Sequence, residues 1–330
     1  MQKTKWAIVG TGYIANQFAT GMQVVEDADL VAVVSRKEET AKTFAEKYGA
    51  KTVYTDYDKM LNEEAIDAVY IGIPNDCHYE YIMKALDKKI PVLSEKPMVD
   101  CGWQLENVLN KAVENDTFLM EGMWTRCFPV VRKVREWIAE GKIGEVHSVR
   151  ASFDFKANMN DWQPWKGGIR HAGGALRDVG IYSLAMAYMV FPEGPVQVAS
   201  AMESNGEVDE SCHLLLIYEG GKAAFVSGAF NQSSTPEVEI VGDKGRIIIG
   251  PEMWHPRKAE LIYNDGTKEL TEDDYPASGF QYEIQAVQEC LKNGEKECKH
   301  FTHEESRKIG GLIEETRKVW GIVYAADEQQ

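Results

Sequence analysis

The sequence lacks several features that would define other classes of protein. It has no basic-then-apolar leader and no apolar run of about eighteen residues, so we expect neither secretion nor membrane insertion. Positive charge is scarce, because 36 Lys and Arg stand against 52 Asp and Glu and give a formal net charge of −16. That balance disfavours nucleic acids and anionic membrane surfaces as partners.

Paired cysteines are also missing. No CxxC occurs and no spacing suggests a zinc site, so we expect no bound metal. The scattered cysteines are typical of reduced thiols, and they favour a cytoplasmic protein. They are Cys77, Cys101, Cys127, Cys212, Cys290 and Cys298.

A glycine turn follows the first apolar run of the chain. The run leads directly into Gly10-Thr11-Gly12-Tyr13-Ile14-Ala15, a GxGxxA sequence, and then into residues typical of a helix. In a strand, turn and helix of this kind, the first glycine permits the turn and the second lets the backbone approach a pyrophosphate at the helix N-terminus. Such a turn can also be purely structural, but a second apolar run follows at the distance expected of a nucleotide-binding unit. We therefore predict a dinucleotide site that includes Gly10, Gly12, Tyr13 and Ile14.

The residues after the second apolar run, Ser35, Arg36 and Lys37, indicate which dinucleotide binds. An NAD-preferring fold has Asp or Glu there to hold the ribose 2′-hydroxyl, and this position carries no acid. A hydroxyl followed by two cations suits a 2′-phosphate instead. The same residues would also be ordinary in a solvated loop or a helix start. We predict NADP(H), with NAD(H) as the alternative.

The first third of the 330-residue chain keeps alternating short apolar runs with helix-like segments. This is the pattern of a parallel sheet with crossover helices, and we assign residues 1–123 to a Rossmann-like dinucleotide-binding domain. The expected strands cover residues 5–9, 30–34, 68–73, 91–94 and 118–120.

The pattern changes in residues 124–330, where β-rich runs are separated by tight turns. Adjacent strands joined in this way predict an antiparallel sheet, so the α/β chain has a second domain for substrate binding and oligomerisation. Since few crossover helices cover this sheet, we expect a homo-oligomer. The expected strands cover residues 146–155, 196–203, 213–218, 223–230, 237–241, 246–249 and 259–263, and two helices at 282–291 and 304–320 close the chain.

Polar residues follow two further strands of the first domain. Pro74 ends one strand, and Asn75 and His78 come directly after it, where they could contact the cofactor or make an ordinary turn. Glu95 and Lys96 follow the next strand, before a proline that restricts the backbone of Lys96. A lysine there can approach the nicotinamide ribose and a substrate oxygen, although a surface lysine after a strand is the commoner case.

A third set lies in the second domain, in the glycine-rich approach to a helix. Asp178 and Tyr182 are four residues apart, so on a helix they share one face. A tyrosine near a lysine is a reasonable proton donor to a carbonyl that accepts hydride, because the positive charge lowers its pKa. The alternative is an acid at a helix N-terminus with a half-buried tyrosine. His171, in the same approach, is the next candidate for proton transfer.

Aromatic and basic residues form a fourth set. Singly, each tryptophan is typical of a core or an interface, but together these residues could line a small pocket for an apolar, hydroxyl-bearing substrate. They are Trp124, Arg126, Trp162, Trp165, Arg170, Trp254, His255, Pro256 and Phe280.

These motifs occur in one order that resembles the Gfo/Idh/MocA family of oxidoreductases over nearly the whole chain. The resemblance rests on the GxGxxA turn, Pro74-Asn75-x-x-His78, Glu95-Lys96-Pro97, Glu121-Gly122-Met123-Trp124 and the segment 173–182. Tyr182, the Trp124 segment and Trp254-x-Pro256 look most like the branch that holds dimeric dihydrodiol dehydrogenase and NADP-dependent xylose dehydrogenase. The family fold implied is a Rossmann domain followed by an α/β domain with a large open, mainly antiparallel sheet.

By resemblance, Lys96 is the catalytic lysine, Tyr182 the general acid or base, and Asp178 a carboxylate that positions the substrate or the lysine. The resemblance also implies that Arg150, with Trp124, Trp254 and Phe280, lines the substrate cleft. Arg177 differs from the apolar residue that the family pattern implies between Leu176 and Asp178.

The sequence thus predicts an NADP(H)-dependent oxidoreductase that acts on a hydroxyl-bearing carbon of a sugar, cyclic polyol or dihydrodiol. Two alternatives stay open: an NAD(H)-dependent inositol or sugar dehydrogenase, and a non-catalytic regulator that senses a dinucleotide. The set of Lys96, Asp178 and Tyr182 argues against a sensor, which needs no proton donor.

Overall fold

The computed structural model describes residues 3–158 and 168–329. The chain folds into two compact units, which are described separately below. Unit 1 comprises residues 1–124 and 275–306, and unit 2 comprises residues 125–274 and 307–330. The prediction placed one boundary after residue 123 and did not include the return of residues 275–306 to the first unit.

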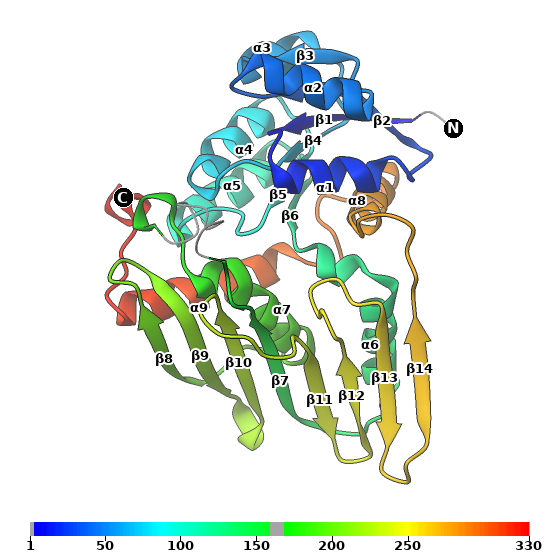
Figure 1. The fold of residues 1–330 in the computed structure, drawn as a ribbon, viewed down its shortest axis with the longest axis vertical. Helices are drawn as coiled ribbons and strands as arrows, with labels where there is room; N and C mark the ends of the chain where they lie inside the picture. Colours follow the sequence, from blue (N-terminus) through cyan, green and yellow to red (C-terminus); the bar gives the residue numbers. More distant parts are fainter. Residues whose placement is uncertain (1–2, 159–167, 330) are drawn as a thin grey trace. The chain divides into compact units, whose positions relative to one another are not determined.

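Unit 1 contains a six-stranded parallel sheet in the order β3-β2-β1-β4-β5-β6 (Figure 1). The order reverses between β1 and β4, and in open α/β sheets ligands bind at the carboxyl ends of strands beside such a reversal. The strands are β1 (Thr4–Val9), β2 (Ala28–Val34), β3 (Thr52–Tyr54), β4 (Ala68–Ile71), β5 (Val92–Glu95) and β6 (Leu119–Gly122). The central strand β4 and the Trp6–Val9 part of β1 are apolar and buried, which is typical of a parallel sheet covered on both faces.

Helices connect these strands and cover the sheet. The connecting helices are α1 (Tyr13–Met22), α2 (Glu38–Tyr48), α3 (Tyr57–Glu63), α4 (His78–Asp87) and α5 (Gly102–Glu114), with a 3₁₀ turn η1 (Asn75–Cys77) before α4. The helix α8 (Gln281–Asn293) of the returning segment packs against α1, and the 3₁₀ turn η2 (Trp124–Cys127) follows β6 at the boundary of the two units. The parallel sheet and its crossover helices confirm the predicted Rossmann-like architecture.

Unit 2 contains an eight-stranded sheet in the order β14-β13-β12-β11-β7-β10-β9-β8 (Figure 1). Of its neighbouring pairs, β7 and β10 are parallel and the others are antiparallel. This confirms the predicted mainly antiparallel sheet. The strands are β7 (Val146–Asp154), β8 (Gln197–Ser204), β9 (Asp209–Ile217), β10 (Ala223–Ala229), β11 (Val238–Gly242), β12 (Gly245–Ile249), β13 (Lys258–Tyr263) and β14 (Lys268–Glu272).

One face of this sheet is packed against helices. The buried side chains of α6 (Pro129–Ala139) lie against β13 and β14, and α7 (Ile181–Val190) lies against β7 and β10. Short segments η3 (Ile169–His171), the π-helix η4 (Leu176–Gly180), η5 (Glu219–Gly221) and η6 (Ala325–Glu328) complete the unit, with the later part of α9 (His303–Val319).

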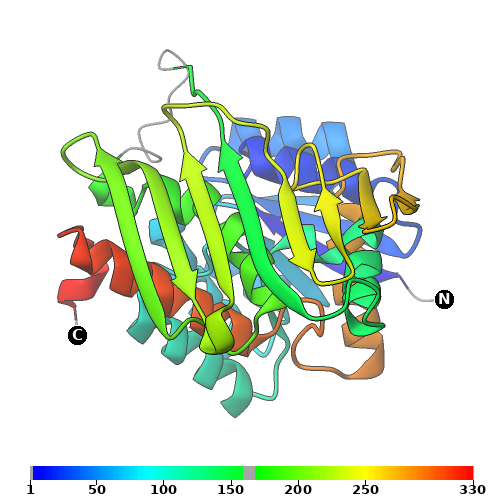
Figure 2. The same cartoon turned by 90° about the horizontal axis from the view of Figure 1, so that it is seen from below.

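The other face of the sheet is turned toward the viewer in Figure 2, and no helix among the described residues of unit 2 lies over it. Apolar side chains stand on this face, including Phe225 (47% exposed) on β10 and Leu270 (54% exposed) on β14. Within the described ranges, no helix is long and apolar enough to cross a membrane.

Candidate active site

The glycine turn between β1 and α1 has the geometry of a phosphate cradle. Gly10 has a φ of +105°, and a Cβ there would lie 2.3 Å from Gly72 O, so only glycine fits. Gly12 is different, because a Cβ at this exposed residue would meet no other part of the described chain within 4 Å, its chain neighbours and own helix backbone apart. No side chain of the described residues caps α1 at Gly12. The open space and the uncapped helix N-terminus fit a pyrophosphate.

Ser35 connects the end of β2 to this turn. Its Oγ lies 3.1 Å from Thr11 Oγ1 and 2.7 Å from Thr40 Oγ1. A hydroxyl in this chain of hydrogen bonds can donate to one neighbour and accept from another. The contact therefore fixes the loop that follows β2 against the glycine turn.

Arg36 and Lys37 are exposed directly after Ser35. The next residue is an acid, Glu38, but it pairs with Lys42 one turn further along α2, with Nζ and Oε1 2.7 Å apart. The hydrogen bond and charge of Lys42 lower the pKa of Glu38. The two cations beyond β2 therefore stand beside an acid that already has a partner.

The predicted cofactor residue His78 is fully buried at the start of α4. Its Nε2 lies 2.8 Å from Ile73 O and its Nδ1 lies 3.0 Å from Pro97 O. The ring thus joins the backbones that follow β4 and β5. This placement differs from the predicted cofactor contact, because both ring nitrogens lie against backbone carbonyl oxygens of the protein. Pro74 and Asn75, by contrast, are at least partly exposed.

Glu95 and Lys96, at the end of β5, have different environments. Glu95 is 6% exposed; its Oε1 accepts a hydrogen bond from Tyr70 OH (2.7 Å) and its Oε2 accepts one from Lys96 N (3.3 Å). The Tyr70 ring stacks on Phe18, with centroids 3.6 Å apart. Glu95 therefore fixes the backbone of Lys96, while the Lys96 side chain is only partly buried.

A second buried acid in unit 1, Glu283 on α8, was not found by sequence reasoning. It is fully buried, and neither carboxyl oxygen has a hydrogen-bond partner among the described residues. Burial raises its pKa, and the charges of Glu95 and Cys298 raise it further. Since an unpaired carboxylate in such a place is very costly, burial favours the protonated form of this group. In sequence, Glu283 is indistinguishable from a solvated helical glutamate.

In unit 2, the predicted residue Asp178 lies on η4, a π-helical turn that runs into α7. A Cβ on Gly228 of β10 would lie 2.6 Å from Gly180 N and 2.7 Å from its Cα. The backbone at the start of α7 therefore lies directly on β10, at a point where the strand has no room for a side chain. This contact sets the position of Asp178 and Tyr182, which flank Gly180.

Tyr182 contributes to an aromatic cluster on the helix-covered face of the sheet. Its ring centroid lies 5.6 Å from that of Phe153 on β7, and Phe153 stacks on Trp254 at 4.1 Å. Thr125 Oγ1 donates a hydrogen bond to Trp254 O (2.5 Å), which fixes the Trp254 backbone. Burial lowers the pKa of the neighbouring His255, so its imidazole is neutral at physiological pH. Sequence reasoning named Tyr182 and Trp254 but missed Phe153.

Arg150, in contrast, lies on the other face of the sheet. It is three residues from Phe153 on β7, and side chains alternate between faces along a strand. Arg150 Nη1 forms an ion pair with Oε2 of Glu239 on the neighbouring strand β11, at 2.8 Å, and the Arg150 side chain is exposed. This placement differs from the prediction that Arg150 lines the substrate cleft, because that cleft was to contain Tyr182.

Two other predicted substrate residues pack against each other in unit 1. Trp124 stacks on Phe280, with centroids 4.2 Å apart, and Phe280 contacts Phe18 edge to face. Phe280 is 2% exposed and supports the packing of α8 on α1. This buried position differs from the prediction that Phe280 contacts the substrate directly.

The remaining predicted residues lie near the gap in the described ranges. Arg170 is exposed on η3, and His171 is half-buried beside it. Trp162 and Trp165 lie outside the described residues. Within the described ranges, no group of three or more His, Cys, Asp or Glu is arranged to hold a metal ion.

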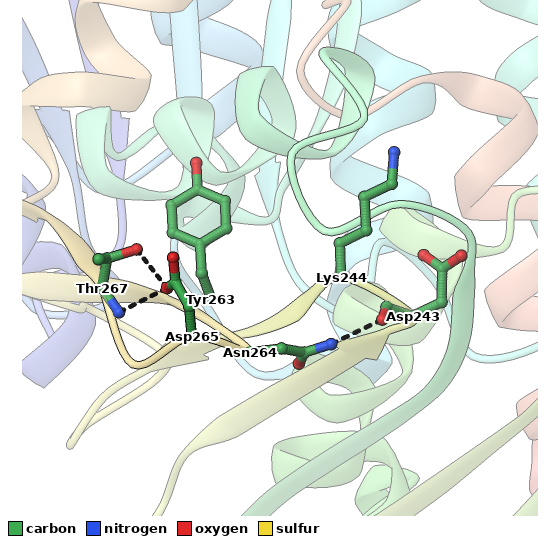
Figure 3. A pocket seen from close by; sticks show the side chains of 6 residues that line it. All are labelled: Asp243, Lys244, Tyr263, Asn264, Asp265 and Thr267. Carbon is green, nitrogen blue, oxygen red and sulfur yellow. Dashed lines mark hydrogen bonds between the residues drawn. The ribbon is translucent and has the colours of Figure 1, made fainter.

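A shallow polar pocket lies at two turns of unit 2 (Figure 3), between Asp243 and Lys244 on one side and Tyr263 to Thr267 on the other. Trp254 lies in the connection between β12 and β13, at the opposite ends of these strands. The Asp265 carboxylate accepts hydrogen bonds from Thr267 N and Oγ1, and Asn264 Nδ2 donates to Asp243 O. The pocket is therefore lined by groups that build the turns, and it is separate from the aromatic cluster.

The cofactor turn and the fold define an oxidoreductase that uses a nicotinamide dinucleotide. Two family models match the chain: an oxidoreductase family with an NAD-binding Rossmann fold over residues 4–123, and the GFO/IDH/MocA C-terminal domain over residues 131–248. The chain belongs to the Gfo/Idh/MocA family, as its motifs predicted.

Two named relatives match nearly full length. The chain is 31% identical to trans-1,2-dihydrobenzene-1,2-diol dehydrogenase of Sus scrofa, covering 98% of this chain and 99% of the relative. It is 30% identical to scyllo-inositol 2-dehydrogenase (NADP(+)) of Bacillus subtilis (strain 168), with the same coverage.

Solved structures share the fold. A 3-ketoreductase from Actinomadura kijaniata in complex with NADP and TDP-benzene is 25% identical, with a TM-score of 0.81, and covers 96% of this chain and 98% of that one. An aldose-aldose oxidoreductase from Caulobacter crescentus is 24% identical, with a TM-score of 0.86, and covers 96% and 97%. This chain is therefore an NAD(P)-dependent oxidoreductase of a family that acts on sugars, polyols and dihydrodiols.

Proposed function

We propose that this protein is an NADP(H)-dependent oxidoreductase that transfers hydride between nicotinamide C4 and a hydroxyl-bearing carbon of a sugar, cyclic polyol or dihydrodiol. The observation that carries the cofactor choice is the pair of exposed cations, Arg36 and Lys37, where an NAD-preferring fold has an acid. The name of the Bacillus subtilis relative, an NADP(+)-dependent scyllo-inositol 2-dehydrogenase, supports the same choice.

Each part of the cofactor is assigned to residues of unit 1. The pyrophosphate would bind the N–H groups at the start of α1, over Gly12, and the 2′-phosphate would bind Ser35, Arg36 and Lys37. Asn75, at the carboxyl end of β4, is assigned to the nicotinamide side. When bound, the cofactor supplies the redox chemistry.

Tyr182 is the proposed general base for oxidation. The substrate O–H proton passes to the phenolate oxygen of Tyr182 while the C–H bond of the same carbon breaks and its electron pair leaves as hydride. In reduction, the phenol returns this proton to the oxygen of the new hydroxyl. The cluster of Phe153 and Trp254 beside Tyr182 supports a substrate with a ring whose apolar face can pack on aromatic side chains.

Lys96 and Asp178 complete the proposed set. The ammonium of Lys96 is assigned to the negative charge that develops on the substrate oxygen. Asp178 positions either the substrate hydroxyls or that ammonium. The two-electron oxidation is thus balanced by one hydride and one proton.

The experiment is a panel of aldoses, inositols and dihydrodiols with NADP⁺ and with NAD⁺, followed at the absorbance of the reduced cofactor. We expect turnover with NADP⁺ on at least one polyol. Tyr182→Phe should lower kcat by roughly 10²–10⁴-fold with little change in NADP⁺ affinity, because only the proton-transfer group is lost.

Tyr218→Phe is the matched control. Tyr218 is also buried in unit 2, and its hydroxyl has no hydrogen-bond partner among the described residues, so the change should leave kcat unaltered. Equal kcat in Tyr182→Phe and wild type would place the proton donor elsewhere, and an absence of turnover with both cofactors would refute the proposed function.

We also propose that the open face of the unit 2 sheet binds a second copy of the chain. Phe225 is exposed on β10, and in register it stands beside Leu215 of β9 and Arg150 of β7. Arg150 pairs with Glu239, so the face mixes apolar surface with both charges, as a self-complementary interface requires. The six cysteines are scattered along the sequence without a CxxC pair, which supports a reducing, cytoplasmic location.

A further inference from the structure

The C-terminal segment of the chain is joined to the backbone that leads to Asp178. Tyr324 is 2% exposed, and its hydroxyl donates a hydrogen bond to Gly173 O at 2.6 Å. Apolar side chains surround this contact in a small separate core, in which Tyr324 and Ile322 pack against Ala172 and Val208. The segment therefore contacts the glycine-rich approach to α7 through both polar and apolar groups.

Two guanidinium groups lie against the Tyr324 ring. Arg177 Cζ is 5.2 Å and Arg317 Cζ is 4.2 Å from the ring centroid. Both arginines are nearly inaccessible, at 4% and 1% exposure, where a cation over an aromatic ring is worth more than at a surface. The Tyr324 ring gives the Arg177 guanidinium a partner inside the protein, which accounts for an arginine where the family pattern implies an apolar residue.

Arg317 is in turn held by an acid of the same segment. Its Nη1 and Nη2 lie 2.7 and 2.6 Å from the two carboxylate oxygens of Asp327 in a bidentate ion pair. Asp327 Oδ2 also accepts a hydrogen bond from Tyr324 N at 2.7 Å. Backbone and ring of Tyr324 are therefore both fixed by α9 and η6.

The other side of the approach is held by β9. Asp209 Oδ2 accepts a hydrogen bond from Leu176 N at 2.6 Å, and Gly174, at φ +125°, leaves room for this carboxylate because a Cβ would lie 2.2 Å from Oδ1. Asp178 N donates to Gly174 O at 3.0 Å. The segment is thus held at Gly173 by Tyr324 and at Leu176 by Asp209.

We propose that Tyr324 is a positioning residue for the reaction: by holding Gly173 and Arg177, it fixes the backbone that places Asp178 and Tyr182 at the substrate. The inference rests on the proposed function, in which these two residues act on the substrate hydroxyl. It makes the C-terminal segment part of the active-site architecture although none of its residues is assigned a chemical step.

Tyr324→Phe tests the proposal, because it removes the donor to Gly173 O and keeps the ring beside both arginines. Hydrogen–deuterium exchange of the protein without substrate should rise roughly 5- to 150-fold in the peptide that covers residues 173–178, the range for leaving a buried carbonyl without its donor. The kcat for the best polyol should fall, by up to about 100-fold, more than its KM changes. The Kd of NADP⁺ should stay within twofold of wild type.

Tyr324→Leu, which also removes the ring, should lower kcat further than Tyr324→Phe, so the aromatic replacement is a partial rescue. Tyr218→Phe is the matched control and should change neither exchange nor kcat. If Tyr324→Phe does not fold, Arg177→Lys provides the second variant, which keeps the charge but loses the planar group, and it should show the same local rise in exchange.

Wild-type exchange and kcat in Tyr324→Phe would overturn the proposal. So would a rise in exchange spread evenly over unit 2, because that result means a general loss of stability rather than a local one. Failure of the proposed function is recognised separately, because the wild-type protein would then show no turnover while its exchange pattern remained measurable.

Discussion

Replacing Gly12 by alanine should separate cofactor binding from folding. Apart from its chain neighbours and its own helix, a Cβ at Gly12 meets no atom of the described residues within 4 Å, and the φ of −75° is allowed for alanine. The free energy of unfolding should therefore change by no more than about 1 kcal/mol, the difference between glycine and alanine at a helix N-cap. The added methyl group occupies the space over α1 that we assign to the pyrophosphate. Losing one charge-assisted hydrogen bond there costs about 1.5–3 kcal/mol, so the Kd of NADP⁺ should rise by roughly 10- to 150-fold.

The assays are isothermal titration with NADP⁺ and thermal unfolding of the unliganded protein. Gly10→Ala is the informative contrast, because its Cβ would lie 2.3 Å from Gly72 O at a φ of +105°, and it should lower Tm as well as affinity. Gly311→Ala on α9 also adds a Cβ in open space and should alter neither cofactor affinity nor turnover. Wild-type affinity for NADP⁺ in Gly12→Ala would refute the placement of the pyrophosphate.

Four further outcomes are expected. Arg36→Ala should weaken NADP⁺ by about 1.5–3 kcal/mol in titrations and leave NAD⁺ nearly unchanged; equal losses would exclude a 2′-phosphate contact. Phe225→Asp should convert the oligomer to a monomer in sedimentation, whereas a wild-type protein that is already a monomer at micromolar concentration would contradict the proposed interface. Gly228→Ala should cost about 1–3 kcal/mol in denaturant unfolding and lower kcat, because its Cβ would lie 2.6 Å from Gly180 N; an unaltered kcat would mean that this contact does not position Tyr182. Burial raises the pKa of Asp209 to about 6 from 3.8, so the folded state binds this proton more tightly than the unfolded state does. The contribution of Asp209 to the free energy of unfolding should therefore fall by up to about 3 kcal/mol as pH rises from 4 to 6, and then stay level. A stability difference between wild type and Asp209→Asn that does not vary over that range would contradict it.

The parallel sheet could be predicted because its buried strands are continuous apolar runs, as in Ala68–Ile71 of β4. The short strand β3 and helix α3 were missed, since three residues, Thr52–Tyr54, give no periodicity that differs from a loop. The return of residues 275–306 to unit 1 has no local signal either. It depends on contacts between α8 and α1, which lie far apart in the sequence.

Local motifs identified backbone constraints better than side-chain environments. The GxG spacing is explained by the two Cβ positions: a Cβ at Gly10 would clash with Gly72 O, and a Cβ at Gly12 would occupy the space assigned to the pyrophosphate. The sequence could not show that His78 is buried against two carbonyl oxygens, because a histidine after a strand has the same local pattern in either environment. The face of Arg150 could have been predicted. Arg150 and Phe153 are an odd number of residues apart on one predicted strand, so their side chains lie on different faces of the sheet.

Hydride transfer itself is the central claim, and deuterium tests it directly. The best substrate of the polyol panel, labelled with deuterium at the carbon that carries the reacting hydroxyl, is incubated with NADP⁺ and the protein, and the mass of the reduced cofactor is measured. Direct transfer predicts NADPH heavier by about 1 Da, formed quickly by wild type and roughly 10²–10⁴-fold more slowly by Tyr182→Phe. Reduced cofactor without deuterium, or none at all, would contradict the account.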